Sequence, residues 1–473
     1  MLKDIKKVKS CARKNKKPAP KKAVKICPSR SGRYKSKSGE AMSRFLVNFT
    51  KVMSFVLFAN FIHATDLAIT APGVYSLSAN IISNPVVGSN NIIQITSSDV
   101  VLDLKDFTIS QANNLAKFNG IEIAPNVSNV TIKNGTIKTL TGTGINVGTG
   151  CSKINIRNLT IDSCFLMAIN MGTFELTDQI IDSNIENVII LNSANAAKVT
   201  DYAGYPPIFM SNCLRCTVRE SYISNCGLVS AVQNNNTFAC VYLASCNNCT
   251  VDSVKMQNNS VFGAVNLNSS TGCLVKNCDF SGANGNLSST GGFIISGGGT
   301  GNLIDNCVAQ NNIAYSAHGF FKIEQSNLNS ITNCSIIGNK SNSSTNYFVA
   351  YVSNNCLFKN CVASDNTTTG IGRGFWAFSI ARTSFIDCVS ANNTGTSSFQ
   401  EVGGMLFAYA SYCELANCQF YNNSGSTDAL SYGLKVFGGS NNLYKDVSAY
   451  ANGPVNPIPA NQMVGVPAGS IIN

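Results

Sequence analysis

Between about residue 66 and residue 453, apolar and polar residues alternate in short runs. Residues 356 to 363, with the sequence CLFKNCVA, are typical of this region. No apolar period of 3.6 residues and no long amphipathic stretch appears after residue 65. Alternation of this kind, bounded by clusters of Asn, Gly and Ser, predicts short β-strands. We therefore expect an all-β protein.

The strands belong to a repeat. One small apolar position returns every 24 to 30 residues, at Val254, Cys278, Cys307, Cys334, Cys361, Cys388, Cys418 and Val447. An asparagine follows most of these positions by five residues, at Asn259, Asn312, Asn339, Asn366, Asn393, Asn423 and Asn452. Traced back to Phe107, the pattern gives thirteen units of about 28 residues. A single coil of this size cannot bury its own apolar face, so the coils are expected to stack around one core.

In such a stack, the asparagines form a column along the molecule. Asn tolerates the left-handed backbone of a sharp bend, and its amide can donate to and accept from the copies above and below. Here the chain resembles the right-handed parallel β-helix proteins of the pectin-lyase-like kind, which carry an Asn ladder at a tight turn. The resemblance implies a single right-handed parallel β-helix of about 13 coils. We assign it to residues 65–453, with an N-terminal cap at 65–95 and a Pro-containing tail at 454–473.

The positive charge lies in the first part of the chain. Residues 1–51 hold 17 of the 35 Lys and Arg residues but only two of the 24 acidic ones. The remaining 422 residues therefore have 18 basic and 22 acidic groups. Because the net charge of +11 belongs to the leader, it predicts no nucleic-acid partner for the body.

The segment 42–64 is predicted to be a signal peptide. It has a basic start, the apolar run 52–62 and a small residue at its end, Ala64. The run is short for a membrane-spanning helix, which needs about 20 apolar residues. Residues 1–41 are then a disordered extension or precede the true start at Met42. We expect a secreted or cell-surface protein; the alternative is a membrane anchor at 42–64. The sequence does not indicate an oligomeric state.

The 19 cysteines fall mainly into columns. One is the repeating position above; the other, five residues earlier in the repeat, comprises Cys216, Cys249, Cys273, Cys356 and Cys413. We expect buried thiols that fill a narrow interior, although bridges between neighbouring coils stay open as an alternative. The CxxC pairs at 213–216 and 246–249 have the ligands of a zinc site. Their spacing is also what two Cys-rich repeats produce, so no metal is predicted.

Candidate catalytic residues are few. The resemblance implies clustered Asp, Ca²⁺ and an Arg base in lyases, or Asp-Asp and Gly-His-Gly motifs in hydrolases. This chain has no Asp-Asp pair, and Ala317-His318-Gly319 is only a fragment of the second motif. The acid-rich long coils supply the first candidates, Asp178, Asp182, Asp201 and Arg215. If the protein is an enzyme, a polysaccharide lyase or glycoside hydrolase is expected, with Ca²⁺ as cofactor only in the lyase case; otherwise no cofactor is expected.

A second candidate surface is non-catalytic. Strand parity places Phe321, Phe348, Phe375, Met405 and Leu434 inward. The opposite parity presents a predicted sugar-binding set, Lys322, Tyr351, Trp376, Phe378 and Phe437. Stacked outward aromatics suit the apolar faces of sugar rings. A parity shifted by one residue would put this set in the core, and a loop could cover it. We therefore expect a β-helix that binds polysaccharide or another surface without catalysis; the alternatives are an enzyme or a structural, adhesive rod.

Overall fold

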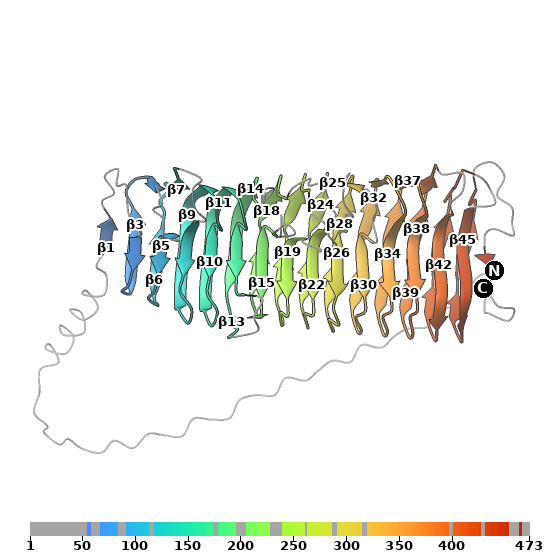
Figure 1. Ribbon diagram of the computed structural model, residues 1–473. Helices are drawn as coiled ribbons and strands as arrows, with labels where there is room; N and C mark the ends of the chain where they lie inside the picture. Colours follow the sequence, from blue (N-terminus) through green and yellow to red (C-terminus); the bar gives the residue numbers. More distant parts are fainter. Residues whose placement is uncertain are drawn as a thin grey trace, which may run out of the picture. The chain divides into compact units, whose positions relative to one another are not determined.

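Repeating parallel strands make up the body of the protein. The computed structural model describes residues 54–57, 67–83, 91–112, 118–173, 178–194, 205–227, 239–260, 263–285, 291–314, 319–396, 401–426, 431–453 and 463–465. Within these ranges there is no helix, and every paired strand runs parallel to its partner. Successive coils stack side by side in a right-handed β-solenoid of about 12 turns (Figure 1). The predicted fold class is confirmed, with about one turn fewer than the 13 expected.

Three sheets run along the solenoid. Sheet B, which carries the predicted sugar-binding residues, has 15 strands. They are β2 (Leu67–Ile69), β5 (Asn91–Ile95), β8 (Asn119–Ile123), β10 (Ile145–Val147), β12 (Ile169–Met171), β15 (Ile208–Ser211), β19 (Ala239–Ala244), β22 (Gly263–Asn268), β26 (Phe293–Ser296), β30 (Phe321–Glu324), β34 (Thr345–Tyr351), β38 (Gly372–Phe378), β42 (Val402–Ser411), β45 (Ser431–Ser440) and β48 (Met463–Val464).

Sheet A has 28 strands in two columns, which the long strands β9, β11 and β14 connect. They are β1 (Ser54–Leu57), β3 (Gly73–Leu77), β4 (Ile81–Ser83), β6 (Val100–Asp103), β7 (Thr108–Gln111), β9 (Ser128–Leu140), β11 (Ser152–Cys164), β13 (Ile180–Ile181), β14 (Asn184–Leu191), β16 (Cys213–Leu214), β17 (Thr217–Arg219), β18 (Tyr222–Ser224), β20 (Thr250–Asp252), β21 (Lys255–Gln257), β23 (Leu274–Lys276), β24 (Asp279–Ser281), β27 (Leu303–Asp305), β28 (Val308–Gln310), β31 (Ser330–Thr332), β32 (Ser335–Ile337), β35 (Leu357–Lys359), β36 (Val362–Ser364), β39 (Ser384–Ile386), β40 (Val389–Ala391), β43 (Glu414–Ala416), β44 (Gln419–Tyr421), β46 (Leu443–Lys445) and β47 (Ser448–Tyr450). Sheet C has five strands, β25 (Asn284–Gly285), β29 (Ile313–Ala314), β33 (Lys340–Ser341), β37 (Thr367–Thr368) and β41 (Thr394–Gly395).

One continuous apolar core fills the interior. It includes a stack of phenylalanines on the inner side of sheet B, where Phe293, Phe321, Phe348 and Phe375 follow one another at ring-centroid distances of 4.8, 5.2 and 4.9 Å. The predicted inward parity is therefore confirmed. The thiols complete the core: the 17 cysteines in the described part of the chain are free and buried. Burial raises the pKa of Cys356 to about 11, so this thiol stays protonated at neutral pH.

The asparagine column is a buried hydrogen-bonded ladder. Asn312 donates its side-chain amide to Oδ1 of Asn339, at 2.9 Å, and the same link repeats from coil to coil up to Asn452. A second turn carries an equivalent column, in which Asn302, Asn329 and Thr383 stand where other coils have cysteine. The spacing in the sequence predicted only the cysteine members of this column and not its Asn and Thr members.

The prediction that the ladder asparagines themselves have a left-handed backbone is wrong. The left-handed residues are those just before the ladder, such as Asn311, Asn392 and Asn422, with φ of 54°, 57° and 54°. The ladder asparagines themselves are not among the residues with positive φ in the described ranges. The bend turns the side chain of the left-handed residue outward, and the next side chain then points into the core. The tight turn thus needs two adjacent residues with different tasks.

Two predicted segments outside the main repeat hold short strands. In segment 42–64, β1 pairs with β3, and in the tail 454–473, β48 pairs with β45. In segment 65–95, assigned to the cap, β2 and β3 already pair with the following coil. The structure describes no helix that is long and apolar enough to span a bilayer. The signal peptide stays a prediction.

Candidate functional site

The outer face of sheet B carries the strongest candidate site. Along β38, Phe375 points into the core and is fully buried, whereas Trp376 and Phe378 lie on the opposite side and are partly exposed. Register stacks Tyr351 on Phe378 and places Phe437 two strands farther on. Four of the five predicted sugar-binding residues therefore gather on one surface. The alternative in which they form the core is excluded.

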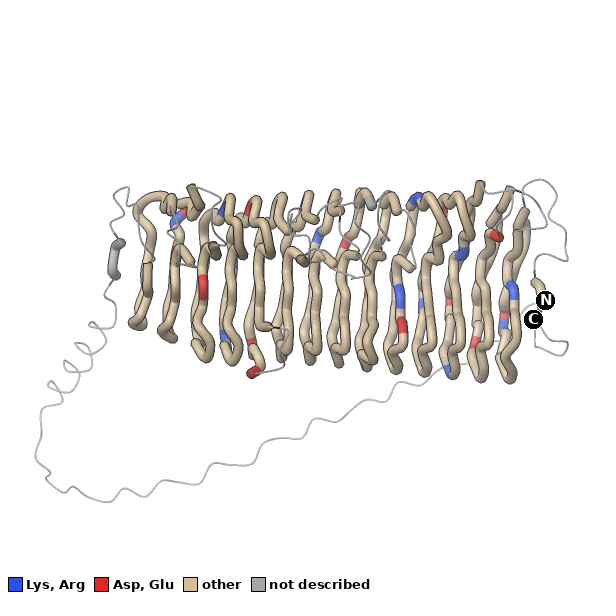
Figure 2. The backbone as a smooth tube through the Cα atoms, in the orientation of Figure 1, with Lys and Arg blue, Asp and Glu red and all other residues tan. Residues whose placement is uncertain are grey.

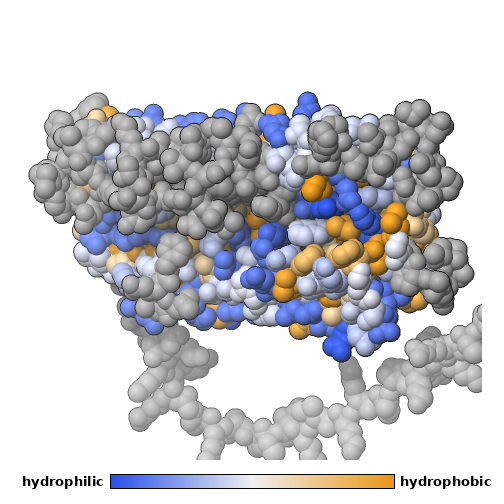
Figure 3. Space-filling model, turned by 45° about the vertical axis from the view of Figure 1, so that its right-hand side comes forward, coloured by the Kyte–Doolittle hydropathy of each residue, from blue (hydrophilic) through white to orange (hydrophobic). Residues whose placement is uncertain are grey.

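We call Tyr351, Trp376, Phe378, Tyr409 and Phe437 the aromatic cluster. Tyr351 lies 5.6 Å from Trp376 and 5.5 Å from Phe378, measured between ring centroids. Tyr409 meets the edges of Phe378 and Phe437 at 5.5 and 5.4 Å. The side chains of Tyr409 and Phe437 are 51% and 56% exposed, so the end of the cluster is open to solvent. Figure 3 shows hydrophobic residues gathered on the described surface toward the C-terminal coils.

Sequence reasoning missed Tyr409. Its neighbour Ala408 occupies the outward position of the strand, so alternation would turn Tyr409 inward. The backbone at Tyr409 is instead left-handed, with φ of 52°, and this places the ring outside. Its partner in the next strand is Gly438, which also has positive φ and leaves room for the tyrosine ring. In the sequence, the only sign of this outward turn is that the tyrosine aligns with a glycine in the next repeat.

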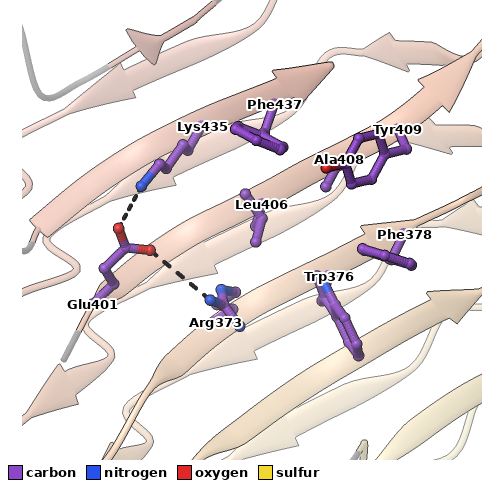
Figure 4. Close-up of a pocket in the computed structure, with 9 residues that line it drawn as sticks. All are labelled: Arg373, Trp376, Phe378, Glu401, Leu406, Ala408, Tyr409, Lys435 and Phe437. Carbon is purple, nitrogen blue, oxygen red and sulfur yellow. Dashed lines mark hydrogen bonds and ion pairs between the residues drawn. The ribbon is translucent and has the colours of Figure 1, made fainter. Parts of the chain in front are cut away.

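A hollow opens beside the aromatic cluster and has a charged edge (Figure 4). Trp376, Phe378, Tyr409 and Phe437 line it together with Leu406 and Ala408, and its charged edge is formed by Arg373, Glu401 and Lys435. The volume of about 380 Å³ lies within the range of small-molecule sites, roughly 300–1,000 Å³. Apolar lining with a few convergent polar groups is typical of a ligand site.

The charged edge is held in place by several contacts. Glu401 is paired with Lys435 and lies 3.9 Å from the guanidinium of Arg373. Arg373 Nε also donates to the hydroxyl of Tyr432, at 3.1 Å, and Arg373 Nη1 donates to Asn346 at 3.2 Å. Burial raises the pKa of Tyr432 to about 12, although Arg373 opposes the shift. The phenol is therefore neutral at physiological pH, and the edge combines two cations with one carboxylate.

Arg373 and Glu401 were not among the predicted site residues. Glu401 lies outside strand β42, so strand parity could not orient it. Lys435 follows Leu434, which was predicted to point inward, so alternation places Lys435 outward; its pairing with Glu401, however, joins positions 34 residues apart. Charged residues are sparse along the coils (Figure 2), which makes a cluster of three distinctive.

Lys322, the fifth predicted residue, lies apart from the hollow. It is two strands away from Trp376, with Val349 between them in the register. Val349 is fully buried although it is on the outer face, so the surface is interrupted there. The amino group of Lys322 lies 2.7 Å from Glu324. This ion pair satisfies the charge of Lys322 within its own strand.

The candidate catalytic residues lie elsewhere. Arg215 binds Asp182 through two hydrogen bonds, of 2.7 and 3.0 Å, on neighbouring coils at the edge of sheet A. Hydrogen bonds from Arg215 lower the pKa of Asp182, and the same pair raises the pKa of Arg215. A guanidinium held in this way is a poor base. Asp178 is exposed, and Asp201 and His318 lie outside the described residues.

The four cysteines of the CxxC pairs are buried in the core. Their thiols donate to backbone carbonyls, as Cys213 does to Ser211 at 3.6 Å and Cys249 does to Cys213 at 3.4 Å. In the part of the chain that the structure describes, no group of three or more His, Cys, Asp or Glu side chains is arranged to hold a metal ion.

Comparisons with known proteins find similarity only to solved structures. No protein-family model matches the chain, and no curated protein matches it by sequence. Among solved structures it is similar to the tailspike protein of an E. coli bacteriophage, as a double mutant (12% identity, TM-score 0.48, covering 79% of this chain and 74% of the other). It is also similar to a surface adhesin of Streptococcus pneumoniae (12%, 0.35, 84% and 89%). A third is a periplasmic alginate epimerase (10%, 0.34, 80% and 77%). At these identities and scores, the likenesses carry no argument about activity.

Proposed function

We propose that the protein binds carbohydrate through the aromatic cluster and the adjoining hollow, without catalysing a reaction. The observation that carries the proposal is the open array of Trp376, Phe378, Tyr409 and Phe437 beside a charged edge. Sugar rings have apolar faces that pack on aromatic rings, and their hydroxyls bond to charged groups at the rim. A rigid sheet holds these side chains in place, so little conformational entropy is lost on binding.

The charged edge favours this ligand class over a purely apolar partner. Its three charged groups are partly exposed, with side-chain exposures of 13% for Arg373, 33% for Glu401 and 30% for Lys435. The hydroxyls of a polar ligand can form hydrogen bonds with the exposed parts of these groups. An apolar partner would bury them without new hydrogen bonds, at a cost in free energy.

Replacement of Trp376 by alanine tests the proposal. We expect the variant to lose affinity for at least one glycan that the wild-type protein binds on a glycan array, by about tenfold or more, because the largest ring of the aromatic cluster is removed. Tyr450→Ala is the matched control, since Tyr450 is also an exposed aromatic residue but lies on sheet A. Equal binding of every glycan by wild type and Trp376→Ala, or no binding of any glycan by the wild type, would refute the proposal.

We also propose that the protein acts outside the cytoplasm. The support is the apolar segment 52–62 behind a basic start, followed by Ala64. N-terminal sequencing of protein recovered from the medium or the cell surface is expected to begin near Thr65. A secreted form that retains residue 1 would contradict cleavage, and a form that stays in the membrane fraction would favour an anchor at 42–64.

A further inference from the structure

A second polar cluster lies on sheet B, near its N-terminal end. Glu122, Asn146 and Asn170 occupy the same outward position on β8, β10 and β12, so they stack directly on one another. Asn119 lies three residues before Glu122 on β8. All four side chains are partly exposed. They were not singled out by the sequence, because Asn is common throughout this chain.

The amides form a chain of hydrogen bonds that ends at the carboxylate. Asn170 Nδ2 donates to Asn146 Oδ1 at 2.5 Å. Asn146 Nδ2 donates to both carboxylate oxygens of Glu122, at 2.8 and 2.9 Å. Asn119 Nδ2 adds a bond of 3.2 Å to Glu122 Oε2. Each amide therefore points its donor toward the glutamate.

The glutamate lacks an opposite charge. None of the ion pairs among the described residues includes Glu122. Burial raises its pKa, and the amide donors oppose that shift only in part. A partly buried carboxylate without a cation costs stability. Such a group is expected where a ligand uses it.

A carboxylate oxygen of this cluster can accept a further hydrogen bond. Oε1 of the partly exposed Glu122 accepts a single bond. A carboxylate oxygen has about two lone-pair sites, so it can accept one more. A ligand that fits must bring hydrogen-bond donors, and it needs no negative charge. Neighbouring hydroxyl groups on a sugar ring have this chemistry.

We propose that Asn119, Glu122, Asn146 and Asn170 form a second carbohydrate site on sheet B, which binds a neutral sugar through its hydroxyl groups. The ligand class rests on the function proposed above, but the site does not need the aromatic cluster. Nine strand steps in sheet B separate Glu122 from Trp376, roughly 43 Å at about 4.8 Å per step. A short oligosaccharide therefore occupies one site at a time.

The test uses a printed array of neutral glycans, the full chain and a Trp376→Ala background that removes the first site. We expect the Trp376→Ala protein to keep binding at least one neutral glycan. Addition of Glu122→Gln is expected to weaken that binding by about tenfold or more, because hydrogen bonds to a charged acceptor are lost. Glu414→Gln, on sheet A, is the matched control and should leave the signal unchanged.

Folding of the Glu122→Gln protein can be checked independently by thermal unfolding. The new amide fits the cluster if the amides of Asn146 and Asn170 both rotate by half a turn. The introduced Nε2 would then donate to Oδ1 of Asn146. Nδ2 of Asn146 would donate to Oδ1 of Asn170, which has no partner in the wild-type protein. Because the uncompensated charge is removed, we expect unchanged or raised stability at neutral pH together with weaker binding. A residue with a merely structural role would lower stability instead.

The outcomes separate the two sites. If the wild type binds glycans and Trp376→Ala abolishes all binding, the aromatic site stands and the second site is refuted. Binding by Trp376→Ala that persists after Glu122→Gln also refutes it. If the Glu122-dependent signal disappears in EDTA and returns with Ca²⁺, the cluster is a cation site and the proposal is wrong in its ligand.

Discussion

Replacement of Asn366 by alanine is expected to lower the free energy of unfolding by about 3 kcal/mol or more. Asn366 is fully buried. Its Oδ1 accepts from the backbone and side-chain amides of Asn339, at 2.9 and 3.0 Å, and its Nδ2 donates to the carbonyl of Ile336 at 3.0 Å. Alanine would leave these groups buried without partners, and each such group costs about 1–3 kcal/mol.

The matched control is Asn360→Gly. Asn360 is exposed and left-handed, with φ of 52°, and its amide bonds to Asn333 at the surface. Glycine adopts this conformation without strain, so we expect a change below about 1 kcal/mol. Denaturant unfolding of both variants measures the difference. Similar losses in the two variants would mean that the buried ladder has no special role in stability.

Phe375→Ala is the second large effect that we expect. The ring stacks on Phe348 at 4.9 Å and meets the edges of Phe385 and Phe420 at 6.2 and 6.4 Å. Removal of a fully buried Phe usually costs about 3–5 kcal/mol, because a cavity remains. A solenoid is stabilised mainly by contacts between neighbouring coils. The loss should therefore appear as faster amide hydrogen exchange in β34, β38 and β42.

Phe378→Ala is the control for this prediction. Phe378 is on the same strand, three residues later, but on the outer face. We expect a small change in stability and a loss of glycan binding, the reverse of the effect at Phe375. If Phe378→Ala destabilised the coil as much as Phe375→Ala, the outer ring would be part of the packing and not of an open site.

Strand parity was a reliable guide because side chains of a β-strand alternate strictly. It placed Phe348 and Phe375 inside, and Tyr351, Trp376 and Phe378 outside, as the structure has them. The guide failed at Tyr409, where a left-handed backbone at the end of β42 interrupts the alternation. It also had no means of placing Glu401, which does not belong to a strand.

The catalytic roles of Asp178, Asp182 and Arg215 stay predictions. Acids near an arginine in the sequence suggested a site, and the structure joins Asp182 and Arg215 in an exposed ion pair. Exposed pairs of this kind contribute little to stability, because solvent screens them. Proximity in the sequence does not distinguish such a pair from a reactive one.

The amino-acid sequence alone is enough to predict the solenoid, its period, its inner and outer faces and its buried Asn and Cys columns. These properties follow from local periodicity, which repeats in each coil and therefore needs no knowledge of distant contacts. Which outward side chains meet depends on how the folded coils are placed against one another. Arg373, Glu401 and Lys435 are brought together from three successive coils, and the Glu122 cluster depends on the register between β8, β10 and β12. Such clusters depend on small offsets between coils of unequal length, which no single repeat contains.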